Sequence, residues 1–231
     1  MKIIGKIIKW TLIACIGFLC VLFGRGYLFY NRLMQEQTVT ERVAEIQSDP
    51  QYVPYAYLPE SLVKATVSIE DHRFFEHGGI DYIGLSRALA SWFVPGMVES
   101  GGSTITQQLA KNMYNMFESS LDRKTVEFFI AKDLERNYSK EDIFELYVNV
   151  INYGDQNIGI YEASHGYFQK SVSDLSIFET TLLAGIPQSP ANFQLSNHYE
   201  DALSRQRLVV HRMVENEYLT QEEADWILNQ Q

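Results

Sequence analysis

A chain of 231 residues, 46% of them hydrophobic, can bury one sizeable core, and this composition excludes an intrinsically disordered protein. The formal net charge is −10, but residues 1–30 contain four of the 19 basic residues and none of the 29 acidic ones, so the remainder carries −14. That charge excludes nucleic-acid binding by bulk electrostatics, and the only two cysteines, Cys15 and Cys20, exclude a disulfide framework for the domain.

The N-terminus has the pattern of a membrane anchor. Residues 1–9 are basic, and residues 10–23 form an uncharged apolar run that reaches about twenty residues with its apolar flanks, enough to cross a bilayer. The lysines before the run favour a cytoplasmic N-terminus. A retained anchor is favoured over a cleaved signal peptide, because no small-x-small site follows the run. Leu12–Cys15 resembles a lipobox, but the apolar run continues past Cys15, where a lipoprotein should become polar.

The rest of the chain predicts a mainly α-helical domain. We expect a basic tip and transmembrane anchor in residues 1–30, a linker or membrane-proximal segment in residues 31–56, and the domain in residues 57–231. Apolar residues recur at helical spacing, and few segments alternate as strands do. Residues that favour helix starts are Asp81, Ser139 with Asp142, and Thr220 with Glu223. The expected helices cover 59–77, 82–94, a stretch after 103, 123–138, a stretch after 139, 161–168, 176–184, 199–217 and a stretch after 220; 152–159 and the turn at Pro187 and Pro190 are expected loops.

The first segment with chemical potential is 70–81, where many ionisable side chains stand beside two aromatic residues and two glycines. Phe74 and Phe75 could partly desolvate a carboxylate and raise its pKa toward the value that a general acid or base needs. The alternative interpretation is a helix C-terminus with solvated charges.

The second segment is 101–112, where two glycines precede a helix whose first amides could bind an anion. A polar ridge of Ser103, Gln107 and Lys111 is expected beside an apolar ridge. The alternative is an ordinary amphipathic helix with a polar outer face.

The third segment is 123–127. Arg123 and Lys124 stand near a helix start, where the positive end of the helix dipole disfavours cations, so they suggest an anionic partner. The alternative is an ordinary surface pair between Arg123 and Glu127.

Together these segments resemble the glycosyltransferase domain of bacterial cell-wall synthases, and in particular the monofunctional biosynthetic peptidoglycan transglycosylases of the family 51 type. The resemblance runs from about residue 57 to residue 229, with five motifs in order. The matching residues are Glu70, Asp71, Phe74, His77, Gly79 and Asp81; Gly84, Arg87 and Ala88; every defined position from Gly101 to Asn112; Arg123, Lys124 and Glu127; Lys140, Ile143, Tyr147 and Asn149; and Leu183 through Pro190. Two departures are Ser119, where the family usually has an arginine near the donor diphosphate, and the segment 155–158, which is poor in glycine and tyrosine.

The resemblance implies a lysozyme-like, mainly helical fold with a small membrane-facing jaw, preceded by one N-terminal transmembrane helix. It implies polymerisation of lipid II by inverting glycosyl transfer with release of polyprenyl diphosphate. Glu70 would be the base and Glu127 would assist at the donor side. The expected substrate-binding residues are Asp71, Phe74, His77, Arg87, Ser103, Gln107, Gln108, Lys111, Asn112, Arg123, Lys124 and Gln188.

The same resemblance implies a bacterial cytoplasmic-membrane protein with its domain on the outer face. No cofactor and no protein metal site are expected, although Mg²⁺ or Mn²⁺ would fit at the substrate diphosphate. Expected partners are lipid II, the growing glycan chain, the membrane and other cell-wall synthases, but no nucleic acid. The apolar residues of 85–97 are expected to enter the membrane surface or, alternatively, the core. No transpeptidase domain is expected after Gln231. The alternative functions are a weakly active membrane scaffold and a lysozyme-like lytic hydrolase.

Overall fold

The computed structural model describes residues 2–91 and 102–230. Helices dominate these residues, and the only sheet-like feature among them is an isolated bridge between Asn152 and Ile158. The prediction of a mainly helical fold is confirmed. The α-helices are α1 (Lys2–Glu36), α2 (Val39–Gln47), α3 (Glu60–Glu70), α4 (Tyr82–Ser91), α5 (Ile105–Met113), α6 (Leu121–Asn137), α7 (Lys140–Val150), α8 (Ile160–Phe168), α9 (Ile177–Gly185), α10 (Pro190–Phe193), α11 (Tyr199–Glu215) and α12 (Gln221–Leu228); the 3₁₀ helices are η1 (Tyr55–Tyr57), η2 (Val172–Asp174) and η3 (Ile186–Gln188).

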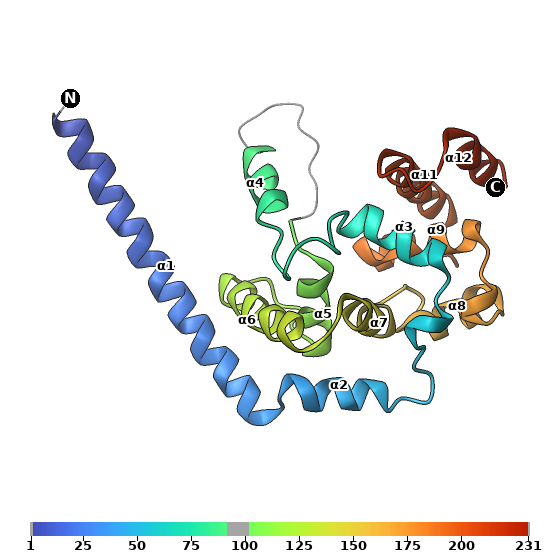
Figure 1. Ribbon diagram of the computed structural model, residues 1–231, viewed down its shortest axis with the longest axis horizontal. Helices are drawn as coiled ribbons and strands as arrows, with labels where there is room; N and C mark the ends of the chain where they lie inside the picture. Colours follow the sequence, from blue (N-terminus) through green and yellow to red (C-terminus); the bar gives the residue numbers. More distant parts are fainter. Residues whose placement is uncertain (1, 92–101, 231) are drawn as a thin grey trace.

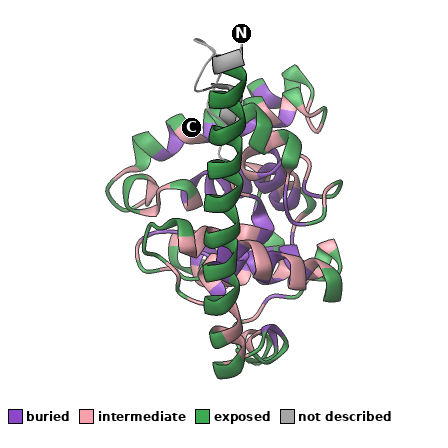
Figure 2. Ribbon diagram, turned by 90° about the vertical axis from the view of Figure 1, so that its left-hand side faces the viewer, coloured by how far each residue is buried: buried purple, intermediate pink, exposed green. Residues whose placement is uncertain are grey.

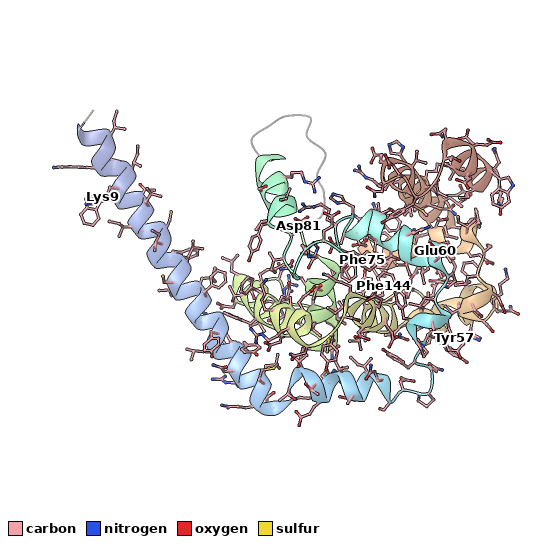
Figure 3. The ribbon with its side chains drawn as sticks, viewed as in Figure 1. Lys9, Tyr57, Glu60, Phe75, Asp81 and Phe144 are labelled. Carbon is pink, nitrogen blue, oxygen red and sulfur yellow. The ribbon has the colours of Figure 1, made fainter. Side chains whose placement is uncertain are left out.

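α1 is a long helix that projects from the body of the molecule (Figure 1). Among the described residues it is the one helix whose length and composition would allow it to cross a membrane, with a mean hydropathy of 2.2. Residues 4–21 of this helix are exposed, whereas its later turns contact α6 (Figure 2). Lys9 extends away from the body, whereas Phe144 of α7 points into its interior (Figure 3). The predicted anchor is therefore part of a helix that continues beyond residue 30.

The segment 31–56, which we expected as a linker or membrane-proximal segment, is largely helical. α2 begins with a capping box, in which the Thr38 hydroxyl accepts from the Glu41 backbone and Glu41 accepts from the Thr38 backbone. Val39 and Val43 are buried, and Arg42 donates to the carbonyl of Met113 at 2.7 Å. The segment therefore packs on the domain and is not a free linker.

The main core surrounds α5, which lies between α6 and α7 (Figure 1). Its apolar ridge of Ile105, Leu109 and Met113 is buried, as the sequence predicted. A second layer is formed by α3, α9 and α11, which pack on one another and place Ala65, Ala184 and Val209 in a smaller apolar cluster. α3 thus joins the two layers.

Two local predictions are wrong. The helix expected over 59–77 ends at Glu70, because Asp71 leaves helical geometry with φ −160° and its side chain accepts from the Ile105 backbone. The turn expected at Pro187 and Pro190 contains η3 and α10, each with a proline near its first position, where a missing amide hydrogen costs nothing.

Candidate active site

A cleft of about 440 Å³ lies where α3 ends. Its walls come from the turn after α3, the first half of α4, the residues before α5, and one face of α11. Asp81 stands at the base of α4 (Figure 3), where its carboxylate accepts from the backbones of Ile83 and Gly84. This confirms Asp81 as the N-cap of α4. The two hydrogen bonds hold the first turn of α4 at this end of the cleft.

Glu70 is the last residue of α3 and lies in this cleft. Its side chain is 10% exposed, and its Oε2 accepts from Gln108 Nε2 at 2.7 Å. Within residues 2–91 and 102–230, its Oε1 is buried and has no hydrogen-bond partner, and it lies 3.9 Å from a guanidinium nitrogen of Arg205. Burial raises the pKa of Glu70, against the opposing effects of the Gln108 hydrogen bond and the positive charges of Arg205 and Lys111. One carboxylate oxygen is therefore available as a proton acceptor.

Gln108 is oriented toward Glu70 by Tyr147 of α7. The Tyr147 hydroxyl donates to Gln108 Oε1 at 3.3 Å, so the amide nitrogen faces the carboxylate. Burial raises the pKa of Tyr147 well above its usual value, so the hydroxyl stays protonated. Tyr147 and Gln108 thus support Glu70 from behind.

A cationic cluster lies at the start of α6. Arg123 Nη1 donates to one oxygen of the buried Glu127 at 2.5 Å, and Lys124 Nζ donates to the other at 2.7 Å. Lys124 also donates to Ser103 at 2.8 Å, and Ser103 lines the Glu70 cleft. The unfavourable position of two cations near a helix start is thus offset by one shared carboxylate.

Lys111 of α5 is close enough to Glu127 and Glu70 for both carboxylates to act on its charge. Burial lowers its pKa, the negative charges of Glu127 and Glu70 raise it, and the positive charges of Arg123 and Lys124 lower it further. Within the part of the chain that the structure describes, Lys111 forms no salt bridge. The cluster of Lys111, Arg123 and Lys124 therefore has one internal counter-charge, Glu127, and can attract an anion.

Three residues expected to bind substrate make internal contacts, and one of them, Asp71, also lines the cleft. Asp71 accepts from the Ile105 backbone at 3.0 Å and contacts His77 Nε2 at 2.9 Å. Phe74 is completely buried, under the Lys140 ammonium group at 4.4 Å from the ring centroid. Phe74 therefore packs in the core, and its expected part in substrate binding stays a prediction.

The other expected residues are distributed around the site. Arg87 lies in the cleft, 3.2 Å from His72, and Gln188 is exposed on its wall. Gln107 turns back to accept from the Thr104 backbone, which completes a capping box. Asn112 faces a separate pocket of about 320 Å³ beside α2, so the structure does not bring it to the Glu70 cleft.

The sequence analysis missed Arg205. This residue lies on α11 between Ala202 and Val209, at spacings of three and four residues, on the stripe that packs against α3 and α9. A basic residue within an otherwise apolar stripe was the available signal. Arg212, about two turns further along α11, also lines the cleft and pairs with Glu215 at 2.5 Å.

Several residues named in the predictions for the segment between α4 and α5 lie outside the described residues. These are Trp92, Phe93, Val94, Met97 and Gly101. Within the described part of that face, Leu85 is 42% exposed, so it is not a core residue. Ser119, the departure from the expected arginine, is exposed just before α6.

Comparison with known proteins gives a consistent result. The family model described as Transglycosylase matches residues 36–214. Penicillin-binding protein 1A of Vibrio cholerae is 33% identical over 243 aligned residues, which cover 97% of this chain and 29% of the relative. The same-named protein of Aquifex aeolicus is 41% identical over 178 residues, covering 77% of this chain and 24% of the relative.

The chain thus spans less than a third of the length of these relatives. A crystal structure of penicillin-binding protein 1A from Haemophilus influenzae is also similar, with 20% sequence identity and a TM-score of 0.45. That match covers 77% of this chain and 17% of the other.

Proposed function

The chain belongs to the transglycosylase family, and on this premise we propose that it is a peptidoglycan glycosyltransferase. It joins lipid II molecules into a glycan strand by inverting glycosyl transfer and releases polyprenyl diphosphate. The observation that carries the proposal is the pairing of a buried, incompletely hydrogen-bonded Glu70 with a cationic cluster on the neighbouring helices. Such a transfer needs a base at one end and positive charge at the other.

Glu70 acts as the base for the attacking sugar hydroxyl. A carboxylate with a raised pKa accepts a proton more readily than an ordinary one. As the hydroxyl oxygen bonds to the anomeric carbon, its proton passes to Glu70 Oε1. Gln108 holds the other oxygen and so fixes the direction from which the proton arrives.

The cationic cluster stabilises the leaving diphosphate. The bond between the anomeric carbon and the diphosphate oxygen breaks on the face opposite the attack, and its electron pair stays with the diphosphate. Lys111, Arg123 and Lys124 supply preorganised charge for this group, and Glu127 holds two of them in place. No cofactor is required, although a divalent cation carried by the diphosphate would add to this charge.

Polar residues of the cleft wall would bind the acceptor sugar. Arg87, Gln188 and Ser103 are accessible donors, and Gln107 flanks them. Asp71 and His77 would act indirectly, by joining the end of α3 to the start of α5. Asn112 would act through α5, because its amide donates to the Gln108 carbonyl at 2.8 Å.

The domain would work at the outer surface of the cytoplasmic membrane. α4 and the N-terminal part of α1 lie on the same side of the body, at the top of Figure 1. Tyr82, Ile83 and Leu85 of α4 are exposed, as expected for a surface that enters the lipid headgroups. A reporter fused after Gln231 should be active only outside the cytoplasm; activity inside would reject this orientation.

Polymerisation of lipid II by the full chain in detergent tests the proposed function. The expected product is a glycan strand whose formation depends on Glu70. Cleavage of a preformed glycan without polymerisation would instead identify a lytic hydrolase. Absence of both reactions, with binding to other cell-wall synthases retained, would identify a scaffold.

A further inference from the structure

α1 packs against the start of α6 through a ladder of aromatic rings. Phe23 lies 5.4 Å from Phe128, and Tyr27 and Tyr30 lie 5.4 Å and 5.6 Å from Phe129, measured between ring centroids. The contact therefore extends over several turns of both helices.

Polar contacts stand at both ends of this ladder. Arg25 forms a salt bridge of 2.7 Å with Asp122, and Tyr30 donates to Asp133. These contacts thus oppose sliding of α1 along α6, and the ring contacts hold the two helices together.

Gly26 is the point of closest approach. A Cβ atom built there would lie 1.8 Å from Thr125 Oγ1 and 2.4 Å from Thr125 Cβ, far inside van der Waals contact. Thr125 cannot easily yield, because its hydroxyl donates to the Asp122 carbonyl at 2.7 Å. A Cβ atom built at Gly24 on the same helix meets no atom of another described element within 4 Å, so α1 requires glycine at position 26 and not at position 24.

The opposite face of the same α6 turns carries the cationic cluster. With 3.6 residues per turn, Glu127 lies about 200° around the helix from Thr125, and Arg123 lies beside Glu127. The first turns of α6 are therefore held between α1 and the site. A shift of α6 that relieved a clash at Thr125 would move Arg123, Lys124 and Glu127 with it.

We propose that Gly26 and Thr125 are positioning residues for glycosyl transfer, and that docking of the membrane helix on α6 sets the location of the leaving-group cations. This inference rests on the proposed function. A displacement of about 1 Å in a group that stabilises a transition state can cost about a hundredfold in rate. α1 is then part of the framework of the site as well as its tether.

The test compares Gly26→Ala with Gly24→Ala in the full chain, in detergent with lipid II. Both changes add one methyl group to the same helix, two residues apart. We expect Gly26→Ala to lower kcat by about tenfold or more with a smaller change in KM, since the displaced cations act most strongly on the developing charge. Gly24→Ala should match the wild type. Equal activity of the two variants would overturn the proposal.

A compensating change separates positioning from general damage. Thr125→Gly removes both atoms that meet the new methyl group and leaves the Thr125 main-chain carbon, at 3.5 Å, as its nearest neighbour. Gly26→Ala combined with Thr125→Gly should recover the kcat of Thr125→Gly alone. Failure to recover, in a protein that melts at the temperature of Thr125→Gly, would count against the proposal.

A second pair of variants covers the case in which Gly26→Ala does not fold. Arg25→Gln removes the ion pair to Asp122 without adding atoms, and Arg32→Gln, an exposed arginine on the same helix, is its control. Only Arg25→Gln should lower kcat, and severalfold. No difference between the two would argue against positioning by α1.

Affinity for inorganic diphosphate, measured by calorimetry on the full chain, gives a readout independent of turnover. It should weaken in Gly26→Ala and Arg25→Gln, but not in their controls. If the wild type binds diphosphate in this pattern yet makes no glycan, the proposed function fails while the positioning role stands. If glycan forms but diphosphate affinity is equal in all variants, the positioning role fails alone.

Discussion

Glu70 and Glu127 are two buried glutamates on different helices, and they differ in how many partners their carboxylate oxygens have. Glu127 shares its two oxygens between Arg123 and Lys124 at 2.5 and 2.7 Å. Among the residues that the structure describes, Glu70 has one hydrogen bond, and its other oxygen is buried without any. Burial alone therefore does not distinguish the two side chains. They differ in the number of their partners, and each hydrogen bond or ion pair to a carboxylate stabilises its charged form.

Of the substitutions considered, a change at Glu70 should lower the polymerisation rate most. Glu70→Gln keeps the shape of the side chain but cannot accept a proton, so polymerisation should fall by about two to four powers of ten. Initial rates with lipid II measure the loss, and Glu76→Gln, an exposed neighbour, is the matched control. A Glu70→Gln enzyme with near-normal turnover would break the assignment of the base.

The same variant should not lose stability. The pKa of Glu70 is raised above its unfolded value of about 4.5, so its ionisation favours the unfolded chain as pH rises through the folded-state pKa. The melting temperature of Glu70→Gln should accordingly equal or exceed that of the wild type at neutral pH, with the gap closing toward pH 4. A clear drop in melting temperature at pH 7 would show that Glu70 is a structural residue.

Glu127→Gln should show the second-largest loss, of about a hundredfold, and the opposite stability result. Its amide cannot neutralise Arg123 and Lys124, and removing one partner of a buried ion pair costs about 3–5 kcal/mol. The side chains of Arg123 and Lys124 should then move apart, because their positive charges repel each other, and the melting temperature should fall together with kcat. A stable Glu127→Gln protein with reduced kcat would instead give Glu127 a direct part in the chemistry.

The support of Glu70 by Gln108 predicts a change in pH dependence. Gln108→Leu removes the one hydrogen bond to the Glu70 carboxylate, worth about 1.5–3 kcal/mol for a charged acceptor, so the pKa should rise further. The acid limb of the kcat/KM profile should then move up by about one to two pH units. Tyr147→Phe, which only loosens Gln108, should move it less; an unmoved limb in both variants would mean that Glu70 does not control it.

The smallest expected effect concerns the exposed Ser119. Ser119→Arg adds a cation before α6, and an exposed ion pair contributes only about 0.2–1 kcal/mol. The apparent KM for lipid II should fall by up to about fivefold, and less at high ionic strength. Lower activity would indicate that this stretch is shaped around serine, so the family's donor contact should not be assigned to it.

The sequence predicted the helical architecture and most helix starts because the responsible interactions are local. The capping boxes at Ser139 and Thr220 form as expected, since they join residues only three positions apart. The apolar ridge of α5 is buried because its spacing leaves one face to cover. The early end of α3 could not be predicted, because the contact that ends it joins Asp71 to Ile105 across 34 positions.

The sequence alone shows which residues are ionisable and stand together in motifs, including Glu70, Glu127 and the three cations, because residue type and motif order can be read from it directly. The surroundings of these charged side chains follow from the tertiary structure. Several features depend on which helices meet: the buried Glu70 oxygen without a hydrogen bond, the Glu127 carboxylate shared by two cations, and the position of Arg205 near Glu70. The contact of Gly26 with Thr125, 99 positions away in the sequence, depends on it as well. The physical reason is that desolvation and close packing arise from atoms brought together by the whole fold, and no local pattern records them.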